Sequence, residues 1–166
     1  MATLGFKAFN SDCTNRYGMK FLENIEYSFD GQLQYGSSNN GFHFCENLED
    51  SFRFFNSFED DIVIGKIIAD DKIVSKDDNF YGYYGLCVTN KIKVLKFMSR
   101  EEVINYGLSL VGERLYRFIR GYKLTADEIK IFQDKFKDDY MAITNIEYYQ
   151  LNDKEAFIKK LGGYNG

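Results

Sequence analysis

Hydrophobic and polar residues alternate with a period of two in the first part of the chain, which predicts β-strands. Leu4 to Phe9 and Gly18 to Phe29 follow this pattern, the second as a strand or one arm of a hairpin. The β-branched and nearly continuous apolar run from Ile62 to Ala69 predicts a central strand. A further strand is expected from Leu86, and alternating lysines make Ile92 to Phe97 typical of a half-exposed edge strand.

The only histidine of the chain lies in a short apolar segment. Gly41 to Cys45 is bounded by turn residues, which predicts a buried strand. Asn47 is expected to cap an amphipathic helix near residues 47–57. The apolar face of that helix has residues spaced i, i+4 and i+7, namely Leu48, Phe52 and Phe55.

Beyond residue 98 the apolar residues take helical spacing. Ser99 to Glu102 and Thr125 to Glu128 have the sequence of a capping box, so a helix is expected to begin at each. Gly107 and Gly112 are expected to divide the first helical stretch into two helices.

The order of these elements predicts a single α+β domain over residues 1–166. Residues 1–98 are expected to be mainly strands, and residues 99–166 mainly helical. Ile143 to Leu151 fits a strand or a helix equally well, and Asp153 to Leu161 predicts a short last helix. The expected sheet is antiparallel, bent or split, with flanking helices.

Composition narrows the class of protein. The chain has 16 Phe and 13 Tyr but no Trp and no Pro, so much of its core must be aromatic. The net charge of −4 argues against nucleic acid as the main partner. No apolar run reaches the ~18 residues that cross a membrane. Three separated cysteines without CxxC spacing indicate reduced thiols and a cytoplasmic location, and one histidine without an HExxH motif predicts no metal site.

Two neighbouring side chains are candidates for chemistry. His43 could bind a nucleotide or act as an acid or base, but a strand histidine that bonds a backbone carbonyl in the core would have the same sequence. Cys45 stands two residues further along the same strand, so the two side chains share one face and could form a thiolate–imidazole pair. The alternative is a small buried thiol.

Two other segments allow a functional or a structural interpretation. Phe80 to Gly85 interleaves aromatic residues, including Tyr81 and Tyr84, with glycine; it could close over a ligand or fill the core. Arg114, Arg117 and Arg120 form a basic stripe at helical spacing. That stripe could bind an acidic partner or be the solvated face of a helix.

The segment from about Gly5 to Glu102 resembles an uncharacterised family of phage and bacterial proteins. The shared residues include Gly-Phe-Lys-Ala-Phe, Cys13, Tyr17-Gly18, and Gly41 to Asn47 as Gly-Phe-His-x-Cys-x-Asn. The resemblance implies no established activity.

The chain also resembles the ADP-ribosyltransferase fold, in its poly(ADP-ribose) polymerase branch. Four segments occur in that family's order, namely Gly41 to Phe44, Ser51 to Phe55, Ile62 to Ala69 and Leu95 to Met98. The departures matter, because the family's catalytic glutamate would fall near Tyr84 or Gly85, where no acid stands. The family's adenine-side tyrosine would fall on His43, and its first-strand histidine or arginine on Lys7. The glutamate stabilises an oxocarbenium-like transition state, so we expect catalysis to be absent or weak.

This second resemblance implies a cleft beside the strand from Gly41 to Cys45. Lys7, Arg16, His43 and an aromatic such as Tyr81 or Tyr84 would line it, with NAD or ADP-ribose as the ligand. We therefore expect a non-catalytic or weakly catalytic binding module. One alternative is an active transferase that uses Glu46 or Asp70 as its acid. The other is an interaction protein that binds a host protein through Arg114, Arg117 and Arg120.

Overall fold

The computed structural model describes residues 2–33, 41–53, 55–75 and 85–152. The chain divides into two compact units, Met1–Ser99 and Arg100–Gly166, which are taken here one at a time. All of the named β-strands belong to the first unit and all of the named α-helices to the second. The expected change from strands to helices near residue 99 is therefore present, and the expectation of one domain stays a prediction.

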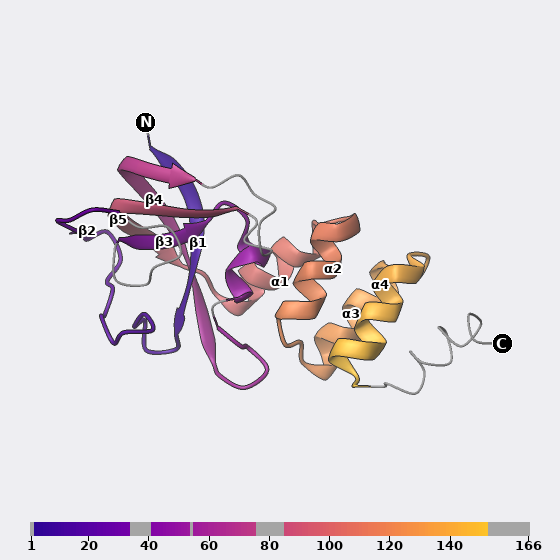
Figure 1. The fold of residues 1–166 in the computed structure, drawn as a ribbon. Coiled ribbons are helices and arrows are strands. Elements are labelled where there is room, and N and C mark those ends of the chain that lie inside the picture. The colour runs from indigo at the N-terminus through magenta and orange to yellow at the C-terminus, as the bar shows by residue number, and fades with distance from the viewer. Residues whose placement is uncertain (1, 34–40, 54, 76–84, 153–166) are drawn as a thin grey trace. The chain divides into compact units, whose positions relative to one another are not determined.

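The first unit is a small antiparallel barrel (Figure 1). Its strands are β1 (Thr3–Asn10), β2 (Glu26–Ser28), β3 (Phe42–Cys45), β4 (Ile62–Ser75) and β5 (Leu86–Phe97). The strand order is β2-β5-β3-β1-β4, and β4 also pairs with β5, so β5, β3, β1 and β4 form a closed ring. The predicted α+β class and antiparallel sheet are confirmed. The sheet was expected to be bent or split, and instead it closes on itself.

Aromatic rings fill the barrel, as the composition predicted. The core joins fully buried residues of four strands and the loop after β1, namely Phe9, Phe21, Phe44, Ile67, Ala69, Cys87, Ile92 and Val94. The Phe9 ring lies 5.1 Å from that of Phe21 and 5.4 Å from that of Phe97, between ring centroids. Such tilted and edge-on contacts are favourable beyond the area they bury.

The prediction of an edge strand at Ile92 to Phe97 is wrong. β5 runs without interruption from Leu86 to Phe97 and pairs with β2, β3 and β4. Ile92 and Val94 are buried in the barrel while the intervening Lys93 is half-exposed. The alternation thus indicated only which face of the strand is exposed to solvent. In a barrel every strand has a solvent-exposed outer face, so the alternation does not identify an edge strand.

The strand expected from Gly18 to Phe29 is reduced to the three residues of β2. Gly18 and Asn24 have φ angles of 84° and 62°, which break the extended conformation. The side chain of Asn15 accepts hydrogen bonds from the backbone N–H groups of Tyr17 and Met19, and this holds the segment as a loop. Local side-chain hydrogen bonds therefore compete successfully with the strand pattern.

The helix expected near residues 47–57 is a 3-10 helix, η1 (Leu48–Arg53). Asn47 does not cap it through a side-chain oxygen; its amide donates to the carboxylate of Asp50 at 3.4 Å. The Ser51 hydroxyl donates to the Leu48 carbonyl at 2.6 Å, three residues back, which suits the tighter helix. Leu48 and Phe52 are buried as predicted.

The second unit holds the helices that the capping boxes predicted. Its elements are α1 (Arg100–Leu108), α2 (Gly112–Gly121), α3 (Ala126–Lys135), α4 (Tyr140–Asn145) and a π-helical turn, η2 (Ile146–Gln150). Thr125 and Glu128 form the predicted capping box, and Gly112, with a φ of 64°, begins α2. The ambiguous segment from Ile143 to Leu151 is helical. The helix predicted from Asp153 to Leu161 lies outside the described residues.

The helices pack around the ring of Phe118. This side chain is fully buried and stacks on Phe132 with 5.8 Å between ring centroids. Gly107 lies against the same ring, because a Cβ atom added there would come within 2.4 Å of the Phe118 Cε1 atom. The glycine that was expected to break a helix thus also permits close packing of α1 on α2.

One ion pair joins the start of α1 to the start of α3. The Arg100 guanidinium donates to both oxygens of Glu128, at 2.7 Å and 2.9 Å, and to the Lys123 carbonyl at 2.6 Å. Its Cζ atom lies 4.9 Å from the centroid of the Tyr122 ring. Burial raises the pKa of Glu128, but the hydrogen bonds from Arg100 and Thr125 outweigh it and lower the pKa below its ordinary value.

The depressed pKa of Glu128 predicts an acid-sensitive helical unit. The pKa of this carboxyl is lower in the folded state than in the unfolded state, where it is near ~4.3. The carboxylate therefore stabilises the fold at pH values above ~4.3, and this contribution is lost as the pH falls through the folded-state pKa. We expect Glu128→Gln to cost about 1–2 kcal/mol of unfolding free energy at pH 7, less than for a buried pair because Arg100 is partly exposed. The cost should shrink below pH 4. Urea unfolding followed by helical circular dichroism measures both.

The control is Asp127→Asn, which removes an exposed acid from the same helical turn. It should cost no more than about 0.5 kcal/mol, because it loses only an interaction with the helix dipole. An equal, pH-independent cost for both variants would contradict the assignment of the stabilisation to the Arg100–Glu128 pair.

Candidate functional site

The barrel wall opens between β1 and β3. The register between these strands is set by one pair, Phe6 opposite Cys45, whereas β1 pairs with β4 along its whole length. Beyond this pair the Lys7 ammonium donates to the carbonyl of His43 at 2.7 Å. A side chain thus takes the place of a ladder hydrogen bond, and the strands part around it.

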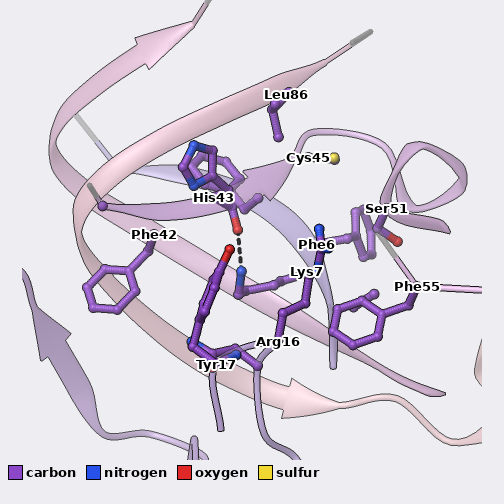
Figure 2. Close-up of a pocket in the computed structure, with 14 residues that line it drawn as sticks. Phe6, Lys7, Arg16, Tyr17, Phe42, His43, Cys45, Ser51, Phe55 and Leu86 are labelled. Atoms are coloured by element: carbon purple, nitrogen blue, oxygen red, sulfur yellow. Dashed lines mark hydrogen bonds between the residues drawn. The ribbon is translucent and has the colours of Figure 1, made fainter. Parts of the chain in front are cut away.

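A cavity of about 200 Å³ lies at this opening. Its wall combines β1, β3, the loop after β1 and the segment around η1. The lining residues are Phe6, Lys7, Ala8, Asn15, Arg16, Tyr17, Gly41, Phe42, His43, Phe44, Cys45, Ser51, Phe55 and Leu86. Figure 2 shows the Lys7 side chain reaching the His43 carbonyl, with Arg16 and Tyr17 contributed by the loop after β1. The cavity therefore offers cationic groups within aromatic walls.

Lys7 has an unusual environment for an amine. Its Nζ atom lies 5.8 Å from the centroid of the Phe9 ring, and it makes no ion pair within the described part of the chain. Burial disfavours the charged form and lowers the pKa of Lys7 to about 8, although Cys45 opposes the shift. At neutral pH the ammonium thus predominates, together with a minor fraction of neutral amine that far exceeds that of an ordinary lysine.

Cys45 does not have the properties of a nucleophilic thiolate. Burial raises its pKa to about 12, and the carboxylate of Asp50 acts in the same direction, against smaller effects of Lys7 and Arg53. The side chain therefore remains a thiol at neutral pH, because a reactive cysteine needs a lowered pKa. This supports the structural alternative for Cys45, a small buried thiol beside the cavity.

The structure brings together three of the residues that the sequence singled out as ligand-binding candidates. Lys7, Arg16 and His43 all line the cavity, while Tyr81 and Tyr84 lie outside the described residues. Sequence reasoning missed Tyr17 and Phe55 as lining residues. Tyr17 was among the residues on which the resemblance to an uncharacterised family rested, and that was the available signal.

The acids considered as substitutes for a catalytic glutamate lie elsewhere. Neither Glu46 nor Asp70 is among the described lining residues, and the Asp70 carbonyl instead accepts a hydrogen bond from Thr89. Gly85 has Asp50 beside it, since an added Cβ atom would come within 3.3 Å of the Asp50 Oδ2 atom. Asp50 is a buried residue of η1, and its Oδ1 atom lies 3.7 Å from the Arg53 Nη2 atom.

The basic stripe of α2 is engaged in contacts within its own unit. Arg120 bonds Glu113 at 3.1 Å and the side chain of Asn145 at 2.9 Å. Arg114 donates to the Tyr106 hydroxyl at 2.8 Å, and Arg117 is half-buried. Binding of a host protein through these residues stays a prediction.

Two other findings concern the described residues alone. In that part of the chain no three His, Cys, Asp or Glu side chains are grouped so that they could hold a metal ion. None of its helices has both the length and the apolar character needed to span a bilayer.

Fold and cavity define the first unit as a small closed antiparallel barrel with a cation-bearing, aromatic pocket in its wall. Residues 3–106 match the model of a family described as a domain of unknown function, DUF7666. Because the match spans more than half of the chain, the protein belongs to this family, and the expectation of an uncharacterised family is confirmed to that extent. No curated protein and no solved structure matches the chain.

Proposed function

We propose that the protein is a binding module whose barrel pocket takes an anionic nucleotide of the NAD or ADP-ribose kind. One observation carries the proposal: Lys7 of β1, Arg16 of the loop after it and His43 of β3 line one cavity with aromatic walls. Ammonium and guanidinium groups form charge-assisted hydrogen bonds with phosphate, and aromatic faces stack on bases.

The size of the cavity limits how much of such a ligand it would enclose. Pockets for drug-sized ligands have roughly 300–1,000 Å³, and this one has about 200 Å³. It would hold one end of a nucleotide, such as a base or a ribose phosphate, with the remainder outside. Tyr17 is more than half exposed, so its ring is accessible to a base at the cavity mouth.

Binding without catalysis is the form of the proposal that the residues favour. The resemblance to ADP-ribosyltransferases suggested the ligand, but it places its glutamate where this chain has Tyr84 or Gly85. Glu46 and Asp70 are not among the residues that line the cavity, which argues against the active-transferase alternative. From the resemblance to ADP-ribosyltransferases, the proposal therefore keeps only the class of ligand.

The single histidine provides the test. During titration with ADP-ribose, and then with NAD, we expect the ring resonances of His43 to shift saturably in NMR spectra. Lys7→Met should weaken binding about tenfold or more, because a charge-assisted hydrogen bond is lost. Since the protonated form of Lys7 binds the anion, affinity should fall as the pH rises through about 8 in the native protein but not in the variant.

Lys66→Met is the matched control. Lys66 is an exposed lysine on β4 that does not line the cavity, and its loss should leave the affinity within about twofold. His43 resonances that ignore millimolar nucleotide would contradict the proposal. An equal loss of affinity in both lysine variants would show that general surface charge, rather than the pocket, attracts the ligand.

A further inference from the structure

The environment of Lys7 points to chemistry beyond reversible binding. Lys7 lines the cavity, and its Nζ atom donates to a neutral backbone carbonyl and has no carboxylate partner among the described residues. A lysine on a protein surface is instead solvated or paired, and its lone pair carries a proton at neutral pH. The neutral amine still has N–H groups to donate to the His43 carbonyl, and its lone pair is then available to attack an electrophile.

We propose that Lys7 is a nucleophilic amine that forms a Schiff base with a small carbonyl compound bearing a negative charge. The neutral Nζ atom attacks the carbonyl carbon, a C–N bond forms as the C=O π bond breaks, and one proton passes from nitrogen to the carbonyl oxygen to give a carbinolamine. The oxygen then takes the second nitrogen proton and leaves as water, so that the C–O bond breaks as a C=N bond forms. Hydrolysis returns the amine and the carbonyl compound. The step is neither an oxidation nor a reduction.

The cavity walls favour this product. Phe6, Phe42 and Phe55 give the cavity apolar walls, a setting in which an imine is hydrolysed less readily than in water, and burial keeps part of the Lys7 population neutral. Cys45 faces the same cavity but remains a thiol, so it does not compete as a nucleophile. Arg16 supplies the positive charge that would attract the anionic group of the ligand. The activity uses the pocket but does not require that it binds nucleotides.

The experiment traps the imine in the folded, full-length protein. Glyoxylate and cyanoborohydride are added at pH 7, and peptide mapping by mass spectrometry gives the rate at each lysine and at the α-amino group. We expect Lys7 to react at least about tenfold faster than Lys66, because a lower pKa leaves much more neutral amine. The preference for glyoxylate over uncharged acetaldehyde should be larger at Lys7 than at Lys66.

Two results would overturn the inference. A trapping rate at Lys7 no faster than that at Lys66 would show that Lys7 is not a selective nucleophile. If Lys7 and Lys66 preferred glyoxylate over acetaldehyde to the same extent, the cavity would not select for a negatively charged carbonyl compound. Lys7→Arg separates this activity from nucleotide binding, because the variant keeps the charge but has no amine to trap. The comparison of lysines within the native protein stands even if that variant does not fold.

Discussion

Phe9→Ala should destabilise the barrel unit by about 3–5 kcal/mol, the usual cost of deleting a fully buried phenylalanine. The Phe9 ring is inaccessible to solvent, contacts Phe21 and Phe97, and lies against Gly65 of β4. Glycine cannot move a side chain into the space that the ring leaves, so the cavity would persist. Native-state hydrogen exchange of β1 and β4 amides measures the loss in this unit alone.

Leu4→Ala is the control on the same strand. Leu4 is 68% exposed, and its truncation should cost no more than about 0.5 kcal/mol. If the two variants had similar stability, the Phe9 ring would not be the centre of the barrel core. Because the Phe9 ring also lies under the Lys7 ammonium, we expect the variant to weaken nucleotide binding as well.

Gly5→Ala is expected to have the second largest effect, about 1–3 kcal/mol. A Cβ atom at this position would come within 2.6 Å of the Cys45 carbonyl oxygen and 2.6 Å of the Phe44 Cδ2 atom. Since one of these atoms belongs to the backbone, β1 and β3 would have to separate next to their Phe6–Cys45 pair. Hydrogen exchange of the barrel amides measures the cost, and the His43 resonances should report the displacement of β3.

Gly65→Ala adds a Cβ atom to the same barrel interior but meets only side chains. Its closest neighbours are the Phe9 ring at 3.0 Å and a Val94 methyl group at 3.3 Å. Side chains can shift by a few tenths of an ångström, so this variant should cost less than Gly5→Ala. The reverse order of stability would show that the backbone approach of β1 to β3 is not the constraint at Gly5.

Sequence patterns predicted those helices and strands that are determined by interactions between residues near one another in the chain. The capping box at Thr125 lies within four residues, so the start of α3 could be predicted from sequence. The β-branched run from Ile62 gave β4 for a similar reason. The same signals failed at η1 and between Gly18 and Phe29, because Asn15, Asn47 and Ser51 form local hydrogen bonds that the apolar spacing does not report.

The candidate site could be predicted only in part. Lys7, Arg16 and His43 were expected together through a resemblance, and the structure does place them around one cavity. Tyr17 and Phe55 complete its walls; both stand in segments that the resemblances used, but neither was assigned to the cavity from sequence. The position of β5 was also misjudged, since alternation cannot distinguish an edge strand from a barrel strand.

The sequence by itself determined an α+β protein with an aromatic core, strands before residue 99 and capped helices after it. These features depend on residue type and on hydrogen bonds between near neighbours. Tertiary structure alone decided that β4 closes on β5, that β1 and β3 part beyond Phe6, and that Lys7 reaches the carbonyl of a residue 36 positions away. The lowered pKa of Lys7 is likewise a tertiary property, because desolvation depends on which distant groups exclude water from the amine.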